Sequence, residues 1–163
     1  MTSPAAEQFS PRPAVESDIP ALTAIEARGH ISPWSAEHFR EELEKPFSEI
    51  LVLSDDETDE RIAGFIVFWI MGEDCQVLDV VVDLPYRGMG HARQLLAHAV
   101  KKALRAECKR VILEVRRSNA PAIGLYQGQK FSISHVRKGF YSNGEDAFVM
   151  ELDLQDQAAL RNF

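Results

Sequence analysis

The 163 residues of this chain suffice for one domain with a substantial core, whereas two full domains would be cramped. A hydrophobic fraction of 45% and a charged fraction of 26% are those of an ordinary soluble globular protein. The net charge of −7 argues against general binding to nucleic acid or to an anionic membrane, because both favour a basic surface.

The amino-terminal segment MTSPAAEQFSPRP lacks both the basic start and the apolar run of a secretion signal. The longest apolar stretch, residues 62–71, is too short to span a bilayer. We therefore expect a cytoplasmic protein that binds no membrane. Cys75 and Cys108 have neither a metal-ligand spacing nor a disulfide pattern, so we expect two buried thiols and no metal site.

The first third of the chain predicts an edge strand followed by two helices. Residues 9–15 form the expected strand, which their prolines confine to a sheet edge. Apolar residues at helical spacing predict a helix from a cap at Ser17 or Asp18 to about residue 28, with a break at Gly29. Ser35 then caps a second helix, which continues to about residue 44.

The remainder alternates between strands and helices. Strands are expected over residues 49–53, 61–71, 75–82, 109–115, 131–141 and 147–154, and helices over residues 90–107 and 119–126. The acidic turn DDETDE separates the first two strands, and Asn143-Gly144 precedes the last. The order predicts one mixed α/β domain, residues 1–154, with a central, mostly antiparallel sheet and helices on both faces. Residues 155–163 are expected to form a loose polar tail.

A glycine-containing turn lies between the expected strand 75–82 and the long helix. A strand that enters such a turn and opens a helix presents free backbone N–H groups at the positive end of the helix dipole, which suits phosphate oxygens. Gly88 and Gly90 let the backbone approach a ligand, and Arg87 and Arg93 can add charge-assisted bonds. A tight turn with a helix cap explains the same pattern. A Walker loop is excluded because no Gly-Lys-Ser/Thr is present.

Two longer motifs are more specific. The stretch VVVDLPYRGMGHARQLL resembles the coenzyme A-binding motif Q/R-x-x-G-x-G/A of the GNAT acetyltransferase superfamily, with Arg87, Gly90 and Ala92 at its fixed positions. LEVRRSNAPAIGLYQGQKF resembles the next block of the same family. Together with Pro33-Trp34-Ser35 and Gly144-Glu-Asp-Ala147, these motifs resemble RimI-type ribosomal-protein alanine N-acetyltransferases across most of the chain.

The resemblance implies the GNAT fold, in which a parallel strand pair splays and the pantetheine arm of acetyl-coenzyme A pairs with the opened strand. The implied backbone contacts fall on Val80, Val81 and Val82, and Asn119 also bonds the coenzyme arm while capping its helix. The implied pyrophosphate site comprises Arg87, Gly88, Met89, Gly90, His91, Ala92 and Arg93. Two positions depart from the family pattern, since Lys130 replaces a usual glycine and Leu84 a usual proline.

The resemblance also implies an acid and a base. Glu114 lies in the apolar strand VILEV, where a carboxylate is costly unless it is paired or functional, and it takes the place of the general base. Tyr126 takes the place of the general acid for the departing sulfur. The alternatives are a solvent-facing Glu114 or a salt bridge to Arg116, and a Tyr126 that only anchors its helix.

The acceptor implied is the α-amine of a protein amino terminus, with alanine first and a ribosomal protein as its source. Trp34, Phe140 and Tyr141 would form aromatic walls at the entrance, and Glu145 or Asp146 would attract a basic peptide. A packing role explains Trp34 equally well. Two other functions fit the cofactor motifs: a GNAT that acetylates lysine or small-molecule amines, and a non-catalytic acetyl-coenzyme A sensor. Glu114 and Tyr126 together argue against the sensor. We expect a monomer or weak dimer.

Overall fold

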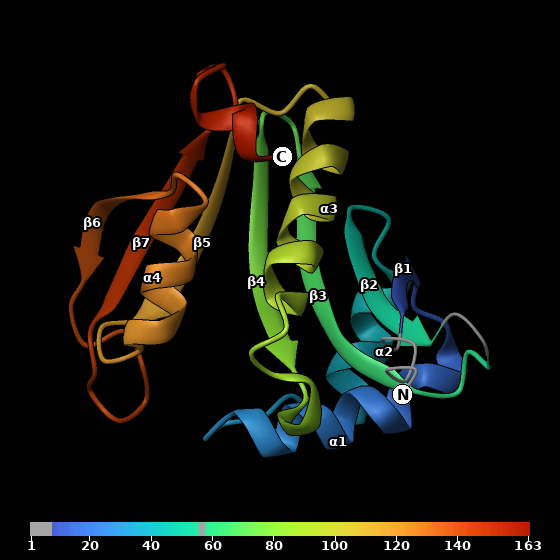
Figure 1. Ribbon diagram of the computed structural model, residues 1–163. Coiled ribbons are helices and arrows are strands. Elements are labelled where there is room, and N and C mark those ends of the chain that lie inside the picture. The colour runs from blue at the N-terminus through green and yellow to red at the C-terminus, as the bar shows by residue number, and fades with distance from the viewer. Residues whose placement is uncertain (1–7, 56–57) are drawn as a thin grey trace, which may run out of the picture. The chain divides into compact units, whose positions relative to one another are not determined.

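The structure, a computed structural model, describes residues 8–55 and 58–163, so most of the amino-terminal segment and part of the DDETDE turn lie outside it. Within those residues, seven strands form a sheet in the order β1-β2-β3-β4-β5-β7-β6 (Figure 1). The strands are β1 Phe9–Pro13, β2 Ser48–Asp55, β3 Ile62–Met71, β4 Asp74–Val82, β5 Arg110–Arg116, β6 Ser132–Arg137 and β7 Ala147–Asp153.

The longer helices are α1 Ile19–Gly29, α2 Ala36–Glu44, α3 His91–Arg105 and α4 Ala120–Gly128, and short 3-10 helices cover η1 Glu16–Asp18, η2 Leu84–Tyr86 and η3 Ala159–Asn162. One strand pair is parallel, and its ladder joins residues 74–77 of β4 to residues 110–113 of β5. The ladders β1–β2, β5–β7 and β6–β7 are antiparallel. The predicted mixed α/β fold is confirmed. None of the helices in the described ranges is long and apolar enough to cross a membrane.

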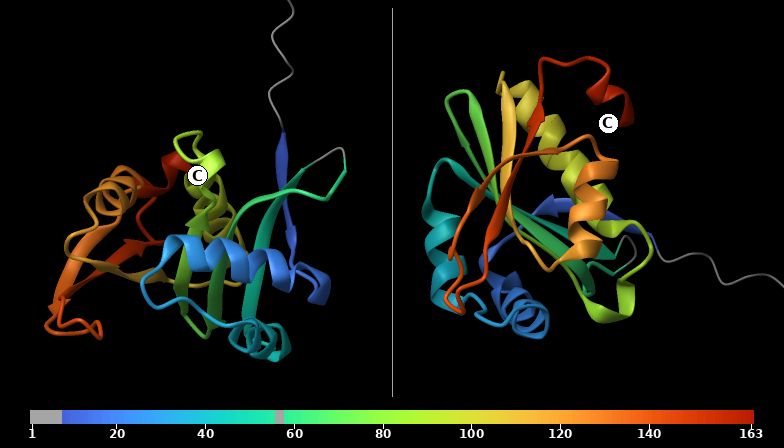
Figure 2. Two further views of the ribbon diagram at one scale, coloured as in Figure 1. Left: turned by 90° about the horizontal axis from the view of Figure 1, so that it is seen from below. Right: turned by 90° about the vertical axis from the view of Figure 1, so that its left-hand side faces the viewer.

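One compact unit contains the chain up to Val67 together with Asp79–Leu96. In it α1 lies beside α2, and α2 packs against β2 (Figures 1 and 2). The rings of Phe39 and Phe65, both fully buried, meet edge to face at 5.4 Å. Ser35 caps α2 as predicted, because its hydroxyl accepts the His38 N–H at 3.3 Å. Asp18 precedes α1 but makes no side-chain cap.

The second unit contains Phe68–Leu78 and Ala97–Phe163. Its ladder β5–β7–β6 carries α4 along one face (Figure 1). Asn119 caps α4 as predicted, since its Oδ1 accepts the Ala122 N–H at 3.3 Å. Cys75 and Cys108 are buried and form no disulfide, which confirms their predicted burial.

One predicted strand boundary and the predicted loose tail are wrong. The strand expected over residues 131–141 ends at Arg137, because Gly139 adopts a left-handed φ of +63° and its N–H turns to Asp146 Oδ1. The first helix ends at Gly29, which agrees with its predicted end near residue 28 and the break at Gly29. A Cβ at Gly29 would lie 3.0 Å from Val81 Cγ1. The carboxyl-terminal tail is not uniformly loose, since it forms η3 and buries Ala159 to 9% exposure.

Candidate active site

The turn between β4 and α3 is open on its outer side. Gly88 and Gly90 have φ values of +76° and +82°, and a Cβ at either position would meet no atom within 4 Å. The Gln94 N–H bonds Gly90 O at 3.0 Å and closes the first turn of α3. Asp83 fixes the start of the segment, because its carboxylate accepts the Leu84 N–H at 3.0 Å. Leu84, in place of the family proline, is therefore compatible with the turn.

The predicted cofactor residues in the first unit, on β4 and in the turn that follows it, differ in exposure. Val81 is buried, whereas Val80 and Val82 are half-buried, and Met89 and Arg93 are exposed. Arg87 Nε donates to Val82 O at 3.0 Å, so the Arg87 side chain ties the turn to the end of β4. Arg87, Gly88 and Gly90 are exposed as well, whereas His91 and Ala92, at the start of α3, are half-buried. His91 packs edge-on against Phe9 with ring centroids 5.4 Å apart.

Glu114 lies on β5 with its side chain 24% exposed, and its Oε1 accepts a hydrogen bond from Arg137 Nη1 at 3.1 Å. The carboxylate is therefore accessible and ion-paired, but its partner is Arg137 rather than Arg116. Arg116 instead places its guanidinium 3.9 Å from the centroid of Tyr141 and pairs with Glu145 at 3.5 Å.

The two predicted aromatic wall residues of the second unit gather beside this ion pair. Phe140 and Tyr141 meet edge to face at 5.0 Å, and the Arg137 guanidinium lies 4.3 Å from the centroid of Phe140. A continuous cluster thus links Glu114 through Arg137 to both rings. Trp34 belongs to the other unit, where its ring lies 5.3 Å from that of Phe39.

Tyr126 lies on α4, is 9% exposed, and packs against Phe131 at 5.9 Å. Lys130 follows α4 with a left-handed φ of +71°, a conformation that glycine adopts without strain. The Phe131 N–H still bonds Tyr126 O at 3.0 Å. Lys130 therefore takes a backbone conformation typical of glycine, the residue that the family usually has at this position.

Glu145 and Asp146 are already engaged within the chain. Glu145 Oε2 accepts the Ser118 N–H at 3.1 Å, and the Ser118 hydroxyl also donates to it. These bonds hold the pKa of Glu145 below its usual value. Asp146 accepts from Gly139 N–H at 3.0 Å and pairs with Arg117 at 3.4 Å. Both carboxylates thus hold the connection between β6 and β7, which limits what they can offer a basic peptide.

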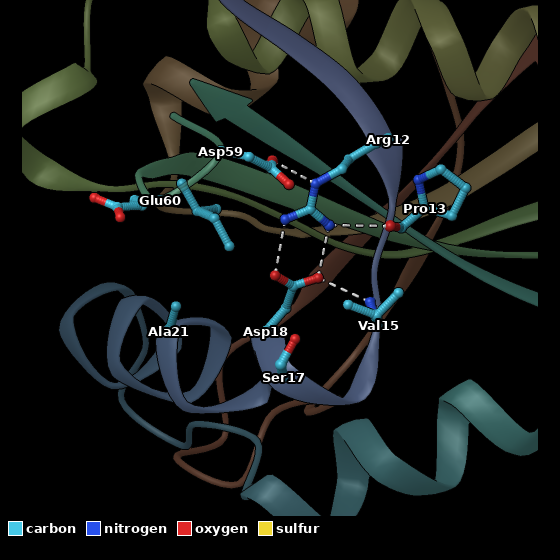
Figure 3. Close-up of a pocket in the computed structure, with 9 residues that line it drawn as sticks. Arg12, Pro13, Val15, Ser17, Asp18, Ala21, Asp59 and Glu60 are labelled. Atoms are coloured by element: carbon cyan, nitrogen blue, oxygen red, sulfur yellow. Dashed lines mark hydrogen bonds and ion pairs between the residues drawn. The ribbon is translucent and has the colours of Figure 1, made fainter. Parts of the chain in front are cut away.

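A surface cavity of about 560 Å³ lies elsewhere in the first unit (Figure 3). Its lining includes none of the predicted site residues: Arg12, Pro13, Val15, Ser17, Asp18, Ala21, Asp59, Glu60 and Ile62. At its centre Arg12 donates to both carboxylate oxygens of Asp18, at 2.8 and 2.9 Å, and to Asp59 at 2.7 Å. The bonds from Arg12 lower the pKa of Asp18. The cavity therefore surrounds a structural ion-pair network.

The structure also contains a polar cluster that the motifs in the sequence do not predict, formed by Glu26, His30 and Asp79. Glu26 on α1 is 1% exposed, and it lies with His30 and Asp79 such that one ligand atom from each falls within 4.8 Å of the others. The hydrophobic periodicity of α1 and of β4 could have indicated this cluster. Glu26 follows Leu22 at helical spacing, and Asp79 alternates with Val77 and Val81 along β4, so both carboxyl groups lie on apolar faces.

Known protein families, sequences and solved structures include relatives of this chain. The model of the acetyltransferase (GNAT) family matches residues 19–131. A Bacillus subtilis (strain 168) protein, provisionally named [ribosomal protein bS18]-alanine N-acetyltransferase, is 36% identical over 85% of this chain and 91% of its own. The crystal structure of the ribosomal-protein-S18-alanine N-acetyltransferase from Escherichia coli has a TM-score of 0.81 and 28% identity, covering 90% of this chain and 94% of that one. An Arabidopsis thaliana structure, NAA60 in complex with acetyl-CoA, shares the fold, with a TM-score of 0.82 and 22% identity over 91% of this chain and all (100%) of that one.

Proposed function

Because this chain belongs to the GNAT acetyltransferase family, we propose that it transfers the acetyl group of acetyl-coenzyme A to the α-amine of a protein amino terminus. The acceptor begins with alanine and comes from a small-subunit ribosomal protein, in the cytoplasm. The names of the Bacillus and Escherichia relatives support this acceptor. The observation that carries the chemistry is the accessible Glu114 carboxylate beside Arg137, Phe140 and Tyr141.

The turn from Arg87 to Arg93 fits a pyrophosphate. Its two glycines leave open space where side chains would otherwise stand, and α3 begins directly after it. Arg93 is exposed and adds positive charge. The backbone of Val80, Val81 and Val82 would hold the pantetheine arm, together with Asn119. The co-substrate supplies an activated acetyl thioester at this place.

Glu114 would accept the proton of the acceptor ammonium, directly or through one water. The neutral amine nitrogen then forms a bond to the acetyl carbonyl carbon. The Val82 N–H would donate to the oxygen on which negative charge develops. As the carbon–sulfur bond breaks, the Tyr126 hydroxyl would give its proton to the sulfur, and the second proton that the nitrogen loses on becoming an amide would restore that hydroxyl. Glu114 would release the first proton to solvent. The products are an N-terminal amide, a free thiol and one proton.

The acidity of the acceptor favours an α-amine. With pKa values of about 8 and about 10.4, roughly 10% of an α-amine but only about 0.04% of a lysine amine is neutral at pH 7. A carboxylate base such as Glu114 therefore removes the proton of an amino-terminal ammonium far more readily than that of a lysine ammonium.

We expect thiol release from acetyl-coenzyme A with a peptide that carries a free amino-terminal alanine, and none with the same peptide blocked there but carrying an internal lysine. A colorimetric thiol assay with the two peptides and a polyamine measures this. Equal rates on both peptides would instead support the lysine or broad-amine alternative, and no release with any amine would support a sensor.

A further inference from the structure

The Glu26 carboxyl group connects three parts of the first unit. Its Oε1 accepts the Trp34 N–H at 3.2 Å, from the segment between α1 and α2. Its Oε2 lies 3.8 Å from His30 Nε2, at the end of α1, and the same His30 nitrogen lies 3.1 Å from Asp79 Oδ1 on β4. The side chains of Glu26 and Asp79 are 2% and 8% exposed, whereas that of His30 is 40% exposed.

Two oxygens of this cluster lack a donor. Glu26 Oε2 and Asp79 Oδ2 are buried, and no group in the described part of the chain donates a hydrogen bond to either. Two ionised carboxylates at this depth would repel each other and leave both oxygens unsatisfied, which is costly. One proton placed between them removes a charge and supplies the missing donor.

The titration of Glu26 agrees with this geometry. Burial, followed by the hydrogen bond and the charge of Asp79, raises the pKa of Glu26 from its usual 4.5 to about 8. Because this pKa is raised, protonation of Glu26 stabilises the folded state. The contribution to the free energy of unfolding is complete below pH 4.5 and is lost as the pH rises through about 8.

The other charged groups near α1 have partners of their own. Arg28 of α1 pairs with Asp83, and Asp18 of η1 pairs with Arg12. Arg40 of α2 pairs with Glu16 and Glu37, and Glu42 of α2 pairs with Lys45, which follows the helix. Asp79 and His30 are therefore the charged groups that act on Glu26.

We propose that Glu26 and Asp79 share one proton and form a clasp that fixes the α1–α2 connection on β4 and so positions Trp34 for the acceptor. Trp34 is held on one side by this clasp through its backbone N–H, and on the other by the ring of Phe39. Asp79 directly precedes Val80 on β4. The clasp therefore connects Trp34, the predicted wall of the acceptor entrance, to the strand that would bind the pantetheine arm. The role of Trp34 toward the acceptor rests on the proposed function, whereas the shared proton does not.

Loss of the proton should loosen the Trp34 segment and weaken acceptor binding, with little effect on acetyl-coenzyme A. Glu26→Gln imitates the protonated state at every pH, because its amide accepts from Trp34 and donates to Asp79. Asp79→Asn supplies the missing donor from the other side. We expect the acceptor KM of the wild type to equal that of Glu26→Gln near pH 6.5 and to exceed it about tenfold at pH 9.5. The ratio of the two values cancels the titration of the acceptor amine.

Glu42→Gln is the matched control, since Glu42 of α2 is also a buried carboxyl but pairs with Lys45, which follows α2, and with Ser48 of β2. It should keep the wild-type pH profile of the acceptor KM. A Glu26→Gln or Asp79→Asn profile that follows the wild type as well would overturn the clasp.

A second readout does not depend on activity. In ¹H–¹⁵N NMR spectra, the backbone amide of Trp34 should titrate with a midpoint near the raised pKa of Glu26 in the wild type, and should not titrate in Glu26→Gln. A wild-type amide that stays constant contradicts the proposal, whether or not any peptide is acetylated. Absence of acetylation with a normal Trp34 titration would instead refute the proposed function alone. EDTA should leave the titration unchanged, and a change would assign the cluster to a bound cation and overturn the shared proton.

Discussion

Glu114→Gln is expected to lower turnover with an N-terminal alanine peptide by about 10²–10⁴-fold, the usual contribution of a general base. Glutamine keeps the shape of the side chain, and its amide oxygen can still accept from Arg137 Nη1, which now lies 3.1 Å away. The cluster with Phe140 and Tyr141 should therefore persist while the proton acceptor is lost. Steady-state kinetics should show a lowered kcat with little change in the KM for acetyl-coenzyme A.

One further variant is a control for the loss of a carboxylate, and another tests the proposed general acid. Glu151→Gln changes a carboxyl on the neighbouring strand β7 that pairs with Arg110 at 3.2 Å, and it should turn over normally. Tyr126→Phe keeps the ring contact with Phe131 but removes the hydroxyl, so it should slow departure of the thiolate. Wild-type turnover of Glu114→Gln across the pH range would remove Glu114 from the base role.

Replacing Gly90 by valine should reduce the affinity for acetyl-coenzyme A by at least about 100-fold, or about 2.7 kcal/mol. The position has a φ of +82°, which a β-branched residue adopts only under strain. The new side chain would also stand on the open outer face of the turn. Because its Cβ would meet no atom of the protein within 4 Å, the fold should survive. Calorimetry with coenzyme A measures the affinity, and circular dichroism checks the fold.

Gly144→Val is the matched control. Gly144 has nearly the same φ, +84°, and equally open space, but it lies in the β6–β7 connection. It should carry the same backbone strain and still bind coenzyme A. Normal binding by Gly90→Val would show that the turn is not the pyrophosphate site.

The order of strands and helices could be read from the sequence because the elements have clean periodicities. Leu95, Leu96 and Ala99 recur at helical spacing in α3, and all three are fully buried. The end of β6 could not, since Phe140 and Tyr141 continue a plausible strand composition. The chain leaves the sheet where Gly139 adopts a left-handed φ and its N–H bonds Asp146, seven residues further on.

The candidate site divides in the same way. Asn119 could be placed as a cap from its local sequence, because a cap acts within one turn. The partner of Glu114 could not, since Arg137 comes from another strand and Arg116 was the neighbour in sequence. The Glu26–Asp79 pair joins a helix to a distant strand, so its proximity depends on the fold.

The most direct test of the central claim is to locate the acetyl group on one peptide that carries both a free amino-terminal alanine and an internal lysine. After incubation with acetyl-coenzyme A at pH 7, tandem mass spectrometry distinguishes acetylation of the α-nitrogen from that of lysine Nζ. We predict a single acetyl group on the alanine α-nitrogen, with the lysine unmodified. Acetylation of the lysine with a free amino terminus would contradict the proposed function.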